Sequence, residues 1–409
     1  MLREGEIPRR TGSAAPALSA LLAAFALCAA FALCAVPLLT PPAAFGAPSS
    51  NAKDDKKVAP KNDKKPDAKP DSKAGAKVAK SAAGGAKRAT LAAATVNLNL
   101  TLARWGAKRE FVRDKETVRW RYRSFTIEAR KDKAYLDIHG LRVFISAPVR
   151  EKHGSYFITR SDYDDTLAPL FYPAATAKTA ARRVRRVLLD PGHGGKMPGT
   201  ENKALGLEEK TLTLDTAKRV KTLLEKKGII VSLTRETDTH LELAERAALA
   251  KVRGADLFVS IHYNSGPASA DGVETYVLTP VGQYSTNDAR RAAAGALTSV
   301  ESGHKQNTWN LVLAYNLQTH LVKKLGANDR GVRRARFGML KDPACPAALV
   351  ECGFISNTAE GKKIATGEHR EKIAQAIVAG ITAYKGVIDG VLDAAERRAH
   401  RGTAAPRKP

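Results

Sequence analysis

The second half of the chain contains a series of short apolar runs that is typical of strands buried on both faces. The runs occupy residues 187–190, 229–234, 257–262, 274–278 and 348–351. Around them, apolar residues recur every three or four positions, which is the period of an amphipathic helix. The predicted helices cover residues 212–227, 241–252, 309–325 and 372–384. Continuous apolar strands that alternate with helices indicate an α/β fold, in which a mostly parallel sheet carries helices on both faces.

Residues 93–176 follow a different pattern. Apolar and polar positions alternate over short runs, for example in residues 118–122 and 134–138, as in half-buried strands. Gly140 and residues 148–154 are predicted to form turns. We therefore expect a small α+β or mostly β module before the α/β domain.

The N-terminus has the features of an export signal. Basic residues precede a long apolar run over residues 14–39, and Ala44-Phe45-Gly46 provides a small-x-small cleavage site. This predicts a signal peptide over residues 1–46 and an exported protein of the periplasm or cell envelope. The length of the run leaves an uncleaved membrane anchor open as the alternative, and we expect membrane contact only through this segment.

The composition then changes. Residues 47–92 are rich in Lys, Ala, Asp and Pro, and they contain no aromatic residue. Such a segment cannot bury enough apolar surface to fold, so it is predicted to be a disordered linker.

Charge is unevenly distributed along the 409 residues, whose net charge is +26. Residues 51–90 carry +7, whereas the much longer segment 187–393 carries only +4. Residues 394–409 carry a further +4 and are predicted to form a basic disordered tail. A nucleic-acid-binding fold gathers Lys and Arg on one folded face, so this distribution argues against a nucleic-acid partner. It favours basic flanking segments that adhere to an anionic surface.

Four polar residues stand where a parallel sheet places its functional groups, beyond the carboxyl ends of the strands. His193 follows the first strand in a glycine-rich turn, His262 and Glu351 end two further strands, and Glu209 opens a helix. Two histidines and a carboxylate can hold Zn²⁺ and leave a fourth position for water. A second carboxylate can take the proton of that water.

These residues lie within motifs that resemble the zinc-dependent N-acetylmuramoyl-L-alanine amidases of the amidase-3 family. The resemblance covers residues 185–386. The matching motifs are Asp190-Pro191-Gly192-His193-Gly194-Gly195, Glu209-Lys210, Thr234-Arg235-x-x-Asp238, Arg246, Ser260-Ile261-His262-Tyr263-Asn264 and Val350-Glu351-Cys352-Gly353-Phe354-Ile355-Ser356-Asn357. The resemblance implies one zinc ion held by His193, Glu209 and His262, with Glu351 as the catalytic carboxylate. It also implies hydrolysis, by zinc-activated water, of the amide between N-acetylmuramic acid and L-alanine in peptidoglycan.

The preceding module, residues 93–176, resembles the copper amine oxidase N-terminal-like domain. The similarity lies in its last part, residues 154–170, and includes no metal motif. Residues 185–386 are expected to fold without this module, because their strands and helices form a complete pattern by themselves.

Substrate and regulatory contacts are expected near the zinc ligands. Asn264 follows His262, and Arg333 and Arg334 lie in a basic stretch that could bind peptide carboxylates or simply face solvent. Some relatives carry a regulatory helix in the region of residues 280–331, so a regulatory protein partner is a further hypothesis. The apolar spacing of residues 309–325 favours ordinary packing for the helix predicted there.

Glu208 and Glu209 are both at a suitable distance from His193, and helical phase distinguishes them. Glu209 falls on the stripe of Ala217 and Val220, which predicts that it is buried, whereas Glu208 falls on the opposite, solvent-facing side. Glu209 is therefore the predicted ligand.

Two other functions remain as alternatives. The first is another zinc hydrolase of the cell wall, either a carboxypeptidase or a deacetylase. The second is a non-catalytic wall-binding protein on the same fold, against which the complete set of four polar residues argues.

Overall fold

The computed structural model describes residues 94–112, 116–286 and 298–403. The predicted signal peptide and nearly all of the predicted linker lie outside these residues. None of the helices within the described ranges is long and apolar enough to cross a membrane.

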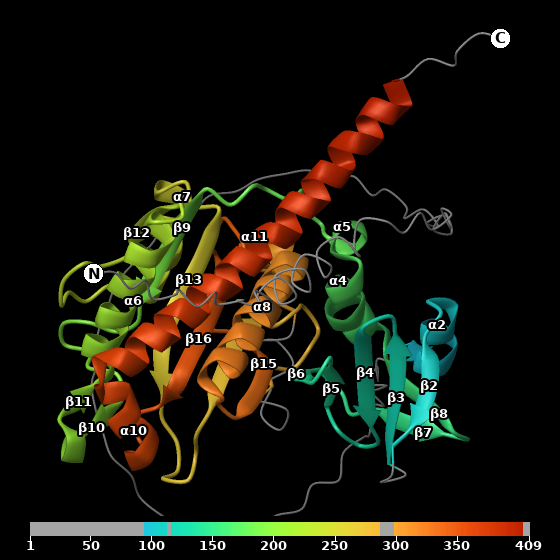
Figure 1. Cartoon of the computed structure of the whole chain (residues 1–409), viewed down its shortest axis with the longest axis horizontal. Coiled ribbons are helices and arrows are strands. Elements are labelled where there is room, and N and C mark those ends of the chain that lie inside the picture. Colours follow the sequence, from blue (N-terminus) through green and yellow to red (C-terminus); the bar gives the residue numbers. More distant parts are fainter. Residues whose placement is uncertain (1–93, 113–115, 287–297, 404–409) are drawn as a thin grey trace, which may run out of the picture. The chain divides into compact units, whose positions relative to one another are not determined.

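One large mixed sheet organises the part of the chain that the structure describes (Figure 1). Its strands in spatial order are β12 (Ile230–Leu233), β9 (Arg186–Pro191), β13 (Leu257–Asn264), β16 (Ala347–Phe354), β14 (Val273–Leu278), β15 (Asp329–Ala335), β6 (Leu141–Phe144), β5 (Tyr135–Ile138), β4 (Phe125–Arg130), β3 (Thr117–Tyr122) and β2 (Lys108–Phe111). The first four strands pair in parallel, β14 is antiparallel to β16, and β15 is parallel to both β14 and β6. The predicted α/β class with a mostly parallel sheet is thus confirmed for the second half of the chain.

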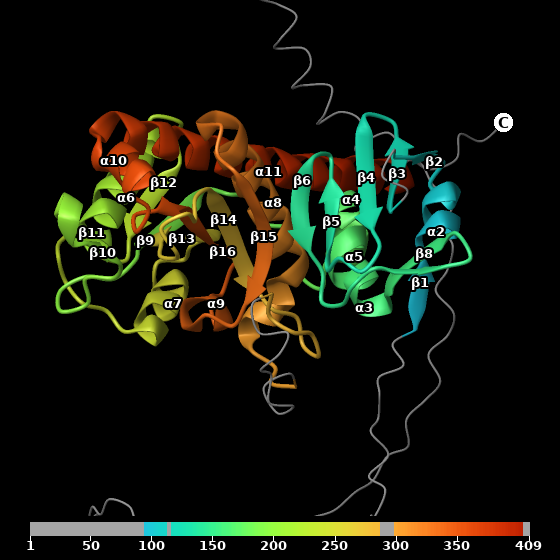
Figure 2. The ribbon, with the colours of Figure 1, turned by 90° about the horizontal axis from the view of Figure 1, so that it is seen from below.

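Helices cover both faces of this sheet (Figure 2). One face carries α6 (Glu209–Glu225), α8 (Asn307–Leu325) and α11 (Gly367–Thr403), and α11 packs against both of the other helices. The other face carries α7 (Leu243–Val252) and α9 (Gly338–Lys341). Val259 and Phe258, neighbours on β13, belong to the two different cores, which explains why the strands are apolar at every position. A short helix, α10 (Thr358–Ala365), follows β16.

The C-terminal helix is longer than the sequence analysis predicts. It was expected over residues 372–384, with a disordered tail from 394, but α11 extends from Gly367 to Thr403. The disordered tail is therefore wrong for residues 394–403, and residues 404–409 lie outside the described part. The reason is an ion-pair cluster, in which Arg183 contacts Asp389, Asp393 and Glu396 on the extended part of the helix.

The N-terminal module forms the other end of the sheet. Strands β2 to β6 form an antiparallel meander, and a second small sheet contains β1 (Thr95–Asn97), β8 (Ser155–Thr159) and β7 (Arg150–Lys152). The module also contains α2 (Leu98–Arg104), α3 (Arg160–Asp162), the π-helical turn η1 (Tyr163–Leu167), α4 (Ala168–Phe171) and α5 (Pro173–Thr176).

The module is continuous with the α/β region, where the sequence predicted two separate domains. Strand β6 pairs with β15 at Val143 and Val332, and the Asp329 carboxylate accepts a hydrogen bond from the Arg142 amide at 2.7 Å. All of the described residues fall within one compact unit. The independent folding of residues 185–386 stays a prediction.

Arg334 connects the two regions from within. Its side chain is buried, and its guanidinium donates to the carbonyl of Asp165 at 2.7 Å and to the side chains of Thr166 and Asn307, both at 3.2 Å. Asn307 in turn donates to the Asp165 carboxylate at 2.9 Å. Burial lowers the pKa of Arg334 to about 10, although Asp165 opposes this change. The predicted substrate-binding role of Arg334 is therefore wrong, because the side chain has no access to a ligand.

We expect Arg334→Ala to lower the free energy of unfolding by about 3 kcal/mol or more, because it leaves buried polar partners unpaired beside the Asp165 charge. Chemical denaturation measures this change. The exposed Arg253→Ala, at the end of α7, is the control and should change the free energy of unfolding by less than about 0.5 kcal/mol. Equal stability of the two variants would contradict this role of Arg334.

Candidate metal centre

Three of the four predicted site residues form one cluster. The Glu209 carboxylate lies between two imidazoles, with Oε2 3.1 Å from His193 Nε2 and Oε1 2.8 Å from His262 Nδ1. One potential ligand atom from each residue lies within 4.8 Å of the others. The cluster therefore provides two nitrogens and a carboxylate around a single point, which is a donor set suited to Zn²⁺.

Glycines allow the two imidazoles to approach one another. His193 has a positive φ of 61°, a conformation that costs about 1–3 kcal/mol in a residue other than glycine. The ring of His262 packs directly on Gly192, where any Cβ would overlap it. At Gly199 a Cβ would lie 2.6 Å from Glu209 Oε2 and 2.7 Å from His193 Cδ2. Both glycines are thus required by close packing against the cluster.

Helical phase places Glu209 as predicted. It is the first residue of α6, lies on the same buried face as Ala217 and Val220, and is 3% exposed. Glu208 precedes the helix, and its side chain is 48% exposed. Burial by itself would raise the pKa of Glu209, but the hydrogen bonds to His193 and His262 outweigh it and lower the pKa.

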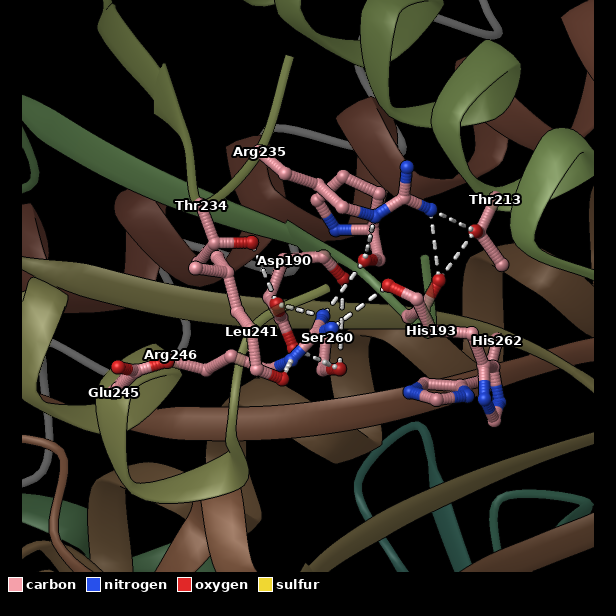
Figure 3. A network of polar contacts seen from close by, with 12 residues as sticks. Asp190, His193, Thr213, Thr234, Arg235, Leu241, Glu245, Arg246, Ser260 and His262 are labelled. Atoms are coloured by element: carbon pink, nitrogen blue, oxygen red, sulfur yellow. Dashed lines mark hydrogen bonds and ion pairs between the residues drawn. The ribbon is translucent and has the colours of Figure 1, made fainter. Parts of the chain in front are cut away.

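Two buried arginines hold the turn that carries His193 (Figure 3). Arg246 donates to the carbonyls of Pro191 at 2.9 Å and His193 at 2.7 Å. Arg235 donates to the carbonyls of Pro191 at 3.0 Å and Gly192 at 2.8 Å. Successive carbonyls of the turn are therefore fixed by two side chains that come from outside it.

Asp190 provides the counter-charge for these arginines. It is fully buried and forms an ion pair of 2.9 Å with Arg246. Thr234 and Ser260 donate to its two oxygens at 2.6 and 2.7 Å. Asp190, Thr234 and Ser260 lie on or directly after three neighbouring strands, so this network also fixes the strands relative to one another (Figure 3).

A smaller polar network holds the next part of the loop. Lys210 donates to Asp238 at 2.9 Å and to the carbonyl of Gly195 at 3.1 Å, and Asp238 accepts from the Gly195 amide at 2.7 Å. The motif residues Lys210 and Asp238 thus act on loop position rather than on the cluster itself.

Glu351 lies on β16, directly opposite His262 on β13. Its Oε2 is buried and has no hydrogen-bond partner among the described residues, and the same is true of His262 Nε2. Burial, the largest cause, raises the pKa of Glu351. Unpaired buried polar atoms are costly, so both atoms mark a place where a ligand or water would complete the structure.

Glu274 is a further polar residue of the site, which no sequence motif singled out, and it lies on β14 directly opposite Glu351. This carboxylate is 2% exposed and forms ion pairs with Arg330 and Arg333, and it accepts a hydrogen bond from Tyr276. A Glu within the apolar run of residues 273–278 was the available signal for it.

The predicted substrate-binding residues lie in different places. Asn264 ends β13 and caps the following turn, where its side chain accepts from the Ser265 amide at 2.8 Å. Arg333 lies beside Glu274 with its guanidinium 4.6 Å from the Phe144 ring. Arg334 lies in the core, as described above. Residues 307–325 form α8, a packed core helix, as their apolar spacing predicted.

Comparison with known proteins gives consistent matches to the α/β region. Residues 187–383 match the family model of N-acetylmuramoyl-L-alanine amidase. The N-acetylmuramoyl-L-alanine amidase AmiA of Salmonella typhimurium is 35% identical over 230 residues, which cover 51% of this chain and 78% of that protein. The uncharacterized protein YqiI of Bacillus subtilis is 36% identical over 200 residues, which cover 49% of this chain and 84% of that protein.

Among solved structures, an N-acetylmuramoyl-L-alanine amidase from Clostridium difficile 630 is 33% identical. The match covers 50% of this chain and 97% of that chain, with a TM-score of 0.40. The family model, together with the identity to AmiA over most of AmiA's length, shows that this chain belongs to the N-acetylmuramoyl-L-alanine amidase family.

Proposed function

We propose that this protein hydrolyses the amide bond between N-acetylmuramic acid and L-alanine in peptidoglycan, with one zinc ion held by His193, Glu209 and His262. Membership of the amidase family supports the reaction and the substrate. The observation that carries the proposal is the convergence of these three side chains beside Glu351 at one edge of the sheet.

The residues present fit a zinc ion. Their donor atoms are two imidazole nitrogens and a carboxylate oxygen, and the carboxylate is held in its charged form by both histidines. Without an ion, the buried Glu351 Oε2 and His262 Nε2 are left unpaired. When bound, zinc would polarise the substrate carbonyl and make a water molecule more acidic.

Glu351 is the group that would move protons in this reaction. Its free Oε2 would accept a proton from the attacking water, and the same oxygen would then donate that proton to the amine of L-alanine as the amide bond breaks. The proton is thus returned, and the carboxylate is regenerated at the end of each cycle. Arg235 and Arg246 have a positioning role, because they hold the turn that carries His193.

We further propose that the protein acts in the cell envelope after export. The probable cell wall amidase LytH of Staphylococcus saprophyticus, 35% identical over 202 residues, supports a site of action at the wall. Peptidoglycan is the proposed partner, and a regulatory protein partner remains a hypothesis.

Digestion of purified peptidoglycan by the full chain tests the reaction. Mass analysis should detect peptides with a free L-alanine amine, and their release should stop with a metal chelator and return with added Zn²⁺. Release of acetate or of a terminal amino acid would instead indicate a deacetylase or a carboxypeptidase. Product release that survives exhaustive chelation would exclude a zinc mechanism.

We expect Glu209→Ala to lose zinc and hydrolysis, because it removes the only carboxylate between the two histidines in the described structure. Glu208→Ala is the matched control, because the Glu208 side chain is adjacent in sequence and half-exposed. This control should retain about one zinc per chain and change stability by no more than about 0.5 kcal/mol. Metal analysis of the two purified variants decides between them, and the reverse pattern would show that the ligand is Glu208.

We expect Glu351→Gln to keep its zinc and to lose turnover by about 10²–10⁴-fold, the loss typical of a general base. The amide has nearly the same size as the carboxylate but cannot accept the proton. Steady-state kinetics together with metal analysis measure both effects, with the exposed Glu236→Gln as a control that should remain active. Loss of metal in Glu351→Gln would make Glu351 a ligand instead.

A further inference from the structure

A cleft of about 280 Å³ lies where the N-terminal module joins the α/β region. Three arginines line it, of which Arg142 comes from β6 of the module and Arg330 and Arg333 come from β15. Phe144 and Asn328 also line the cleft. In both views β6 and β15 lie side by side (Figures 1 and 2).

The cleft opens at the same edge of the sheet as the candidate metal centre. His262 lies opposite Glu351, Glu351 lies opposite Glu274, and Glu274 contacts both Arg330 and Arg333. Directly opposed residues of neighbouring strands share a face, so His262, Glu351 and Glu274 all lie on one face. Charged and polar side chains therefore form a continuous row across neighbouring strands, from His262 on β13 to Arg142 on β6.

The guanidinium groups are fixed by aromatic and acidic neighbours. Arg330 lies 4.7 Å from the Phe354 ring, and its Nε donates to Glu274. Arg142 lies 4.2 Å from the Tyr135 ring, and its Nε forms an ion pair with Asp137 at 3.5 Å. The terminal nitrogens of Arg142 and Arg330 have no hydrogen-bond partner among the residues that the structure describes. A guanidinium group that stacks its flat face on an aromatic ring still has the N–H groups at its edge available to donate hydrogen bonds.

The acidic residues at the cleft have partners of their own. Asp329 accepts from the Arg142 amide at 2.7 Å, from Gln318 at 2.8 Å and from the Gly331 amide at 2.9 Å. Both oxygens of Asp271 accept from Asn328 at 2.9 Å. These carboxylates therefore compete little for the free edges of the arginines.

Gly331 allows a close approach between β15 and the module beside the cleft. It has a positive φ of 92°, and a Cβ there would lie 2.9 Å from the Phe144 ring and 3.1 Å from Cγ of Arg142. Without a side chain at this position, β15 can approach the two module residues directly.

We propose that this cleft binds a carboxylate of the peptide stem of the substrate, and that Arg142 makes the N-terminal module part of the substrate site. Arginine is suited to this task because its planar fork of donors matches the geometry of a carboxylate. The proposal rests on the proposed function, since it takes the acidic peptide of peptidoglycan as the ligand.

The distance selects which carboxylate is bound. Two to three strand spacings of about 4.8 Å separate β16, which carries Glu351, from β15 and β6, a distance of about 10–14 Å. An extended peptide advances about 3.3–3.6 Å per residue, so this distance corresponds to three or four residues. A carboxylate three or four residues from the cleaved amide therefore reaches the cleft, and the C-terminal carboxylate of a tripeptide is the shortest ligand that does so.

Binding of a short synthetic peptide to the full chain tests this proposal without hydrolysis. The probe is L-Ala-γ-D-Glu-L-Lys with a free C-terminal carboxylate, and the matched probe carries a C-terminal amide. We expect the wild-type chain to bind the free acid about tenfold more tightly, as expected for the loss of one charge-assisted hydrogen bond at a partly exposed site. Arg142→Ala should remove this preference and leave the affinity for the amide unchanged. Calorimetry measures both affinities.

Two further variants make the result specific. Arg150→Ala, an exposed arginine on β7 of the same module, is the control and should keep the preference. Arg142→Lys, which keeps the charge, should restore part of it. Equal binding of the two peptides by the wild-type chain, no binding of either, or an equal loss for both peptides in Arg142→Ala would overturn the proposal.

The same experiments separate this proposal from the proposed function. If the chain releases peptides with a free L-alanine amine from peptidoglycan but does not discriminate between the probes, the proposed reaction is supported and the proposed role of the cleft is overturned. If the chain discriminates between the probes but does not cleave peptidoglycan, the proposed role of the cleft is supported and the proposed reaction is overturned.

Discussion

The candidate metal centre depends on a buried charge arrangement that lies behind it. Arg235 and Arg246 bring two guanidinium groups into the protein interior, where Asp190 is the carboxylate paired with Arg246. The remaining donors are satisfied by backbone carbonyls, among them those of Gly192 and His193. Buried charges are tolerated only when they are paired and hydrogen-bonded. If the turn relaxed, the two guanidinium groups would lose their carbonyl partners, and the free energy cost would be large. This constraint holds His193 at a positive φ that the residue would not otherwise adopt.

The other half of the site is fixed by the order of the strands. Glu274 places a second carboxylate opposite Glu351, and like charges at this distance repel. Arg330 and Arg333 compensate this charge, and both lie on β15. Strand β15 is itself held from the far side, by β6 of the N-terminal module and by the burial of Arg334. The module therefore contributes to the electrostatics near Glu351, although His193, Glu209 and His262 themselves all lie in the α/β region.

The extent to which the sequence predicts this structure depends on the range of the interactions concerned. His193, Glu209, His262 and Glu351 could be found because each stands at the end of an apolar run or at a helix start, which are local signals. Helical phase was enough to separate Glu209 from Glu208, because the periodicity of α6 is regular. Arg334 was placed wrongly because its environment comes from residues about 170 positions earlier, and no local pattern records a partner at that distance. The extension of α11 was missed for the same reason, since Arg183 stabilises it from more than 200 positions away.

The polar atoms that lack partners indicate where this fold is incomplete by itself. Among the described residues, the buried atoms without a hydrogen bond include His262 Nε2 and Glu351 Oε2 at the candidate metal centre. Directly behind the centre, Asp190 is a fully buried charge, and Thr234, Ser260 and Arg246 all donate to it. The same fold that pairs this buried charge leaves one oxygen of a carboxylate and one nitrogen of an imidazole at the centre without partners. Buried polar atoms are usually hydrogen-bonded, so these two atoms mark the point of the described fold where a bound ligand or water would supply the missing partners.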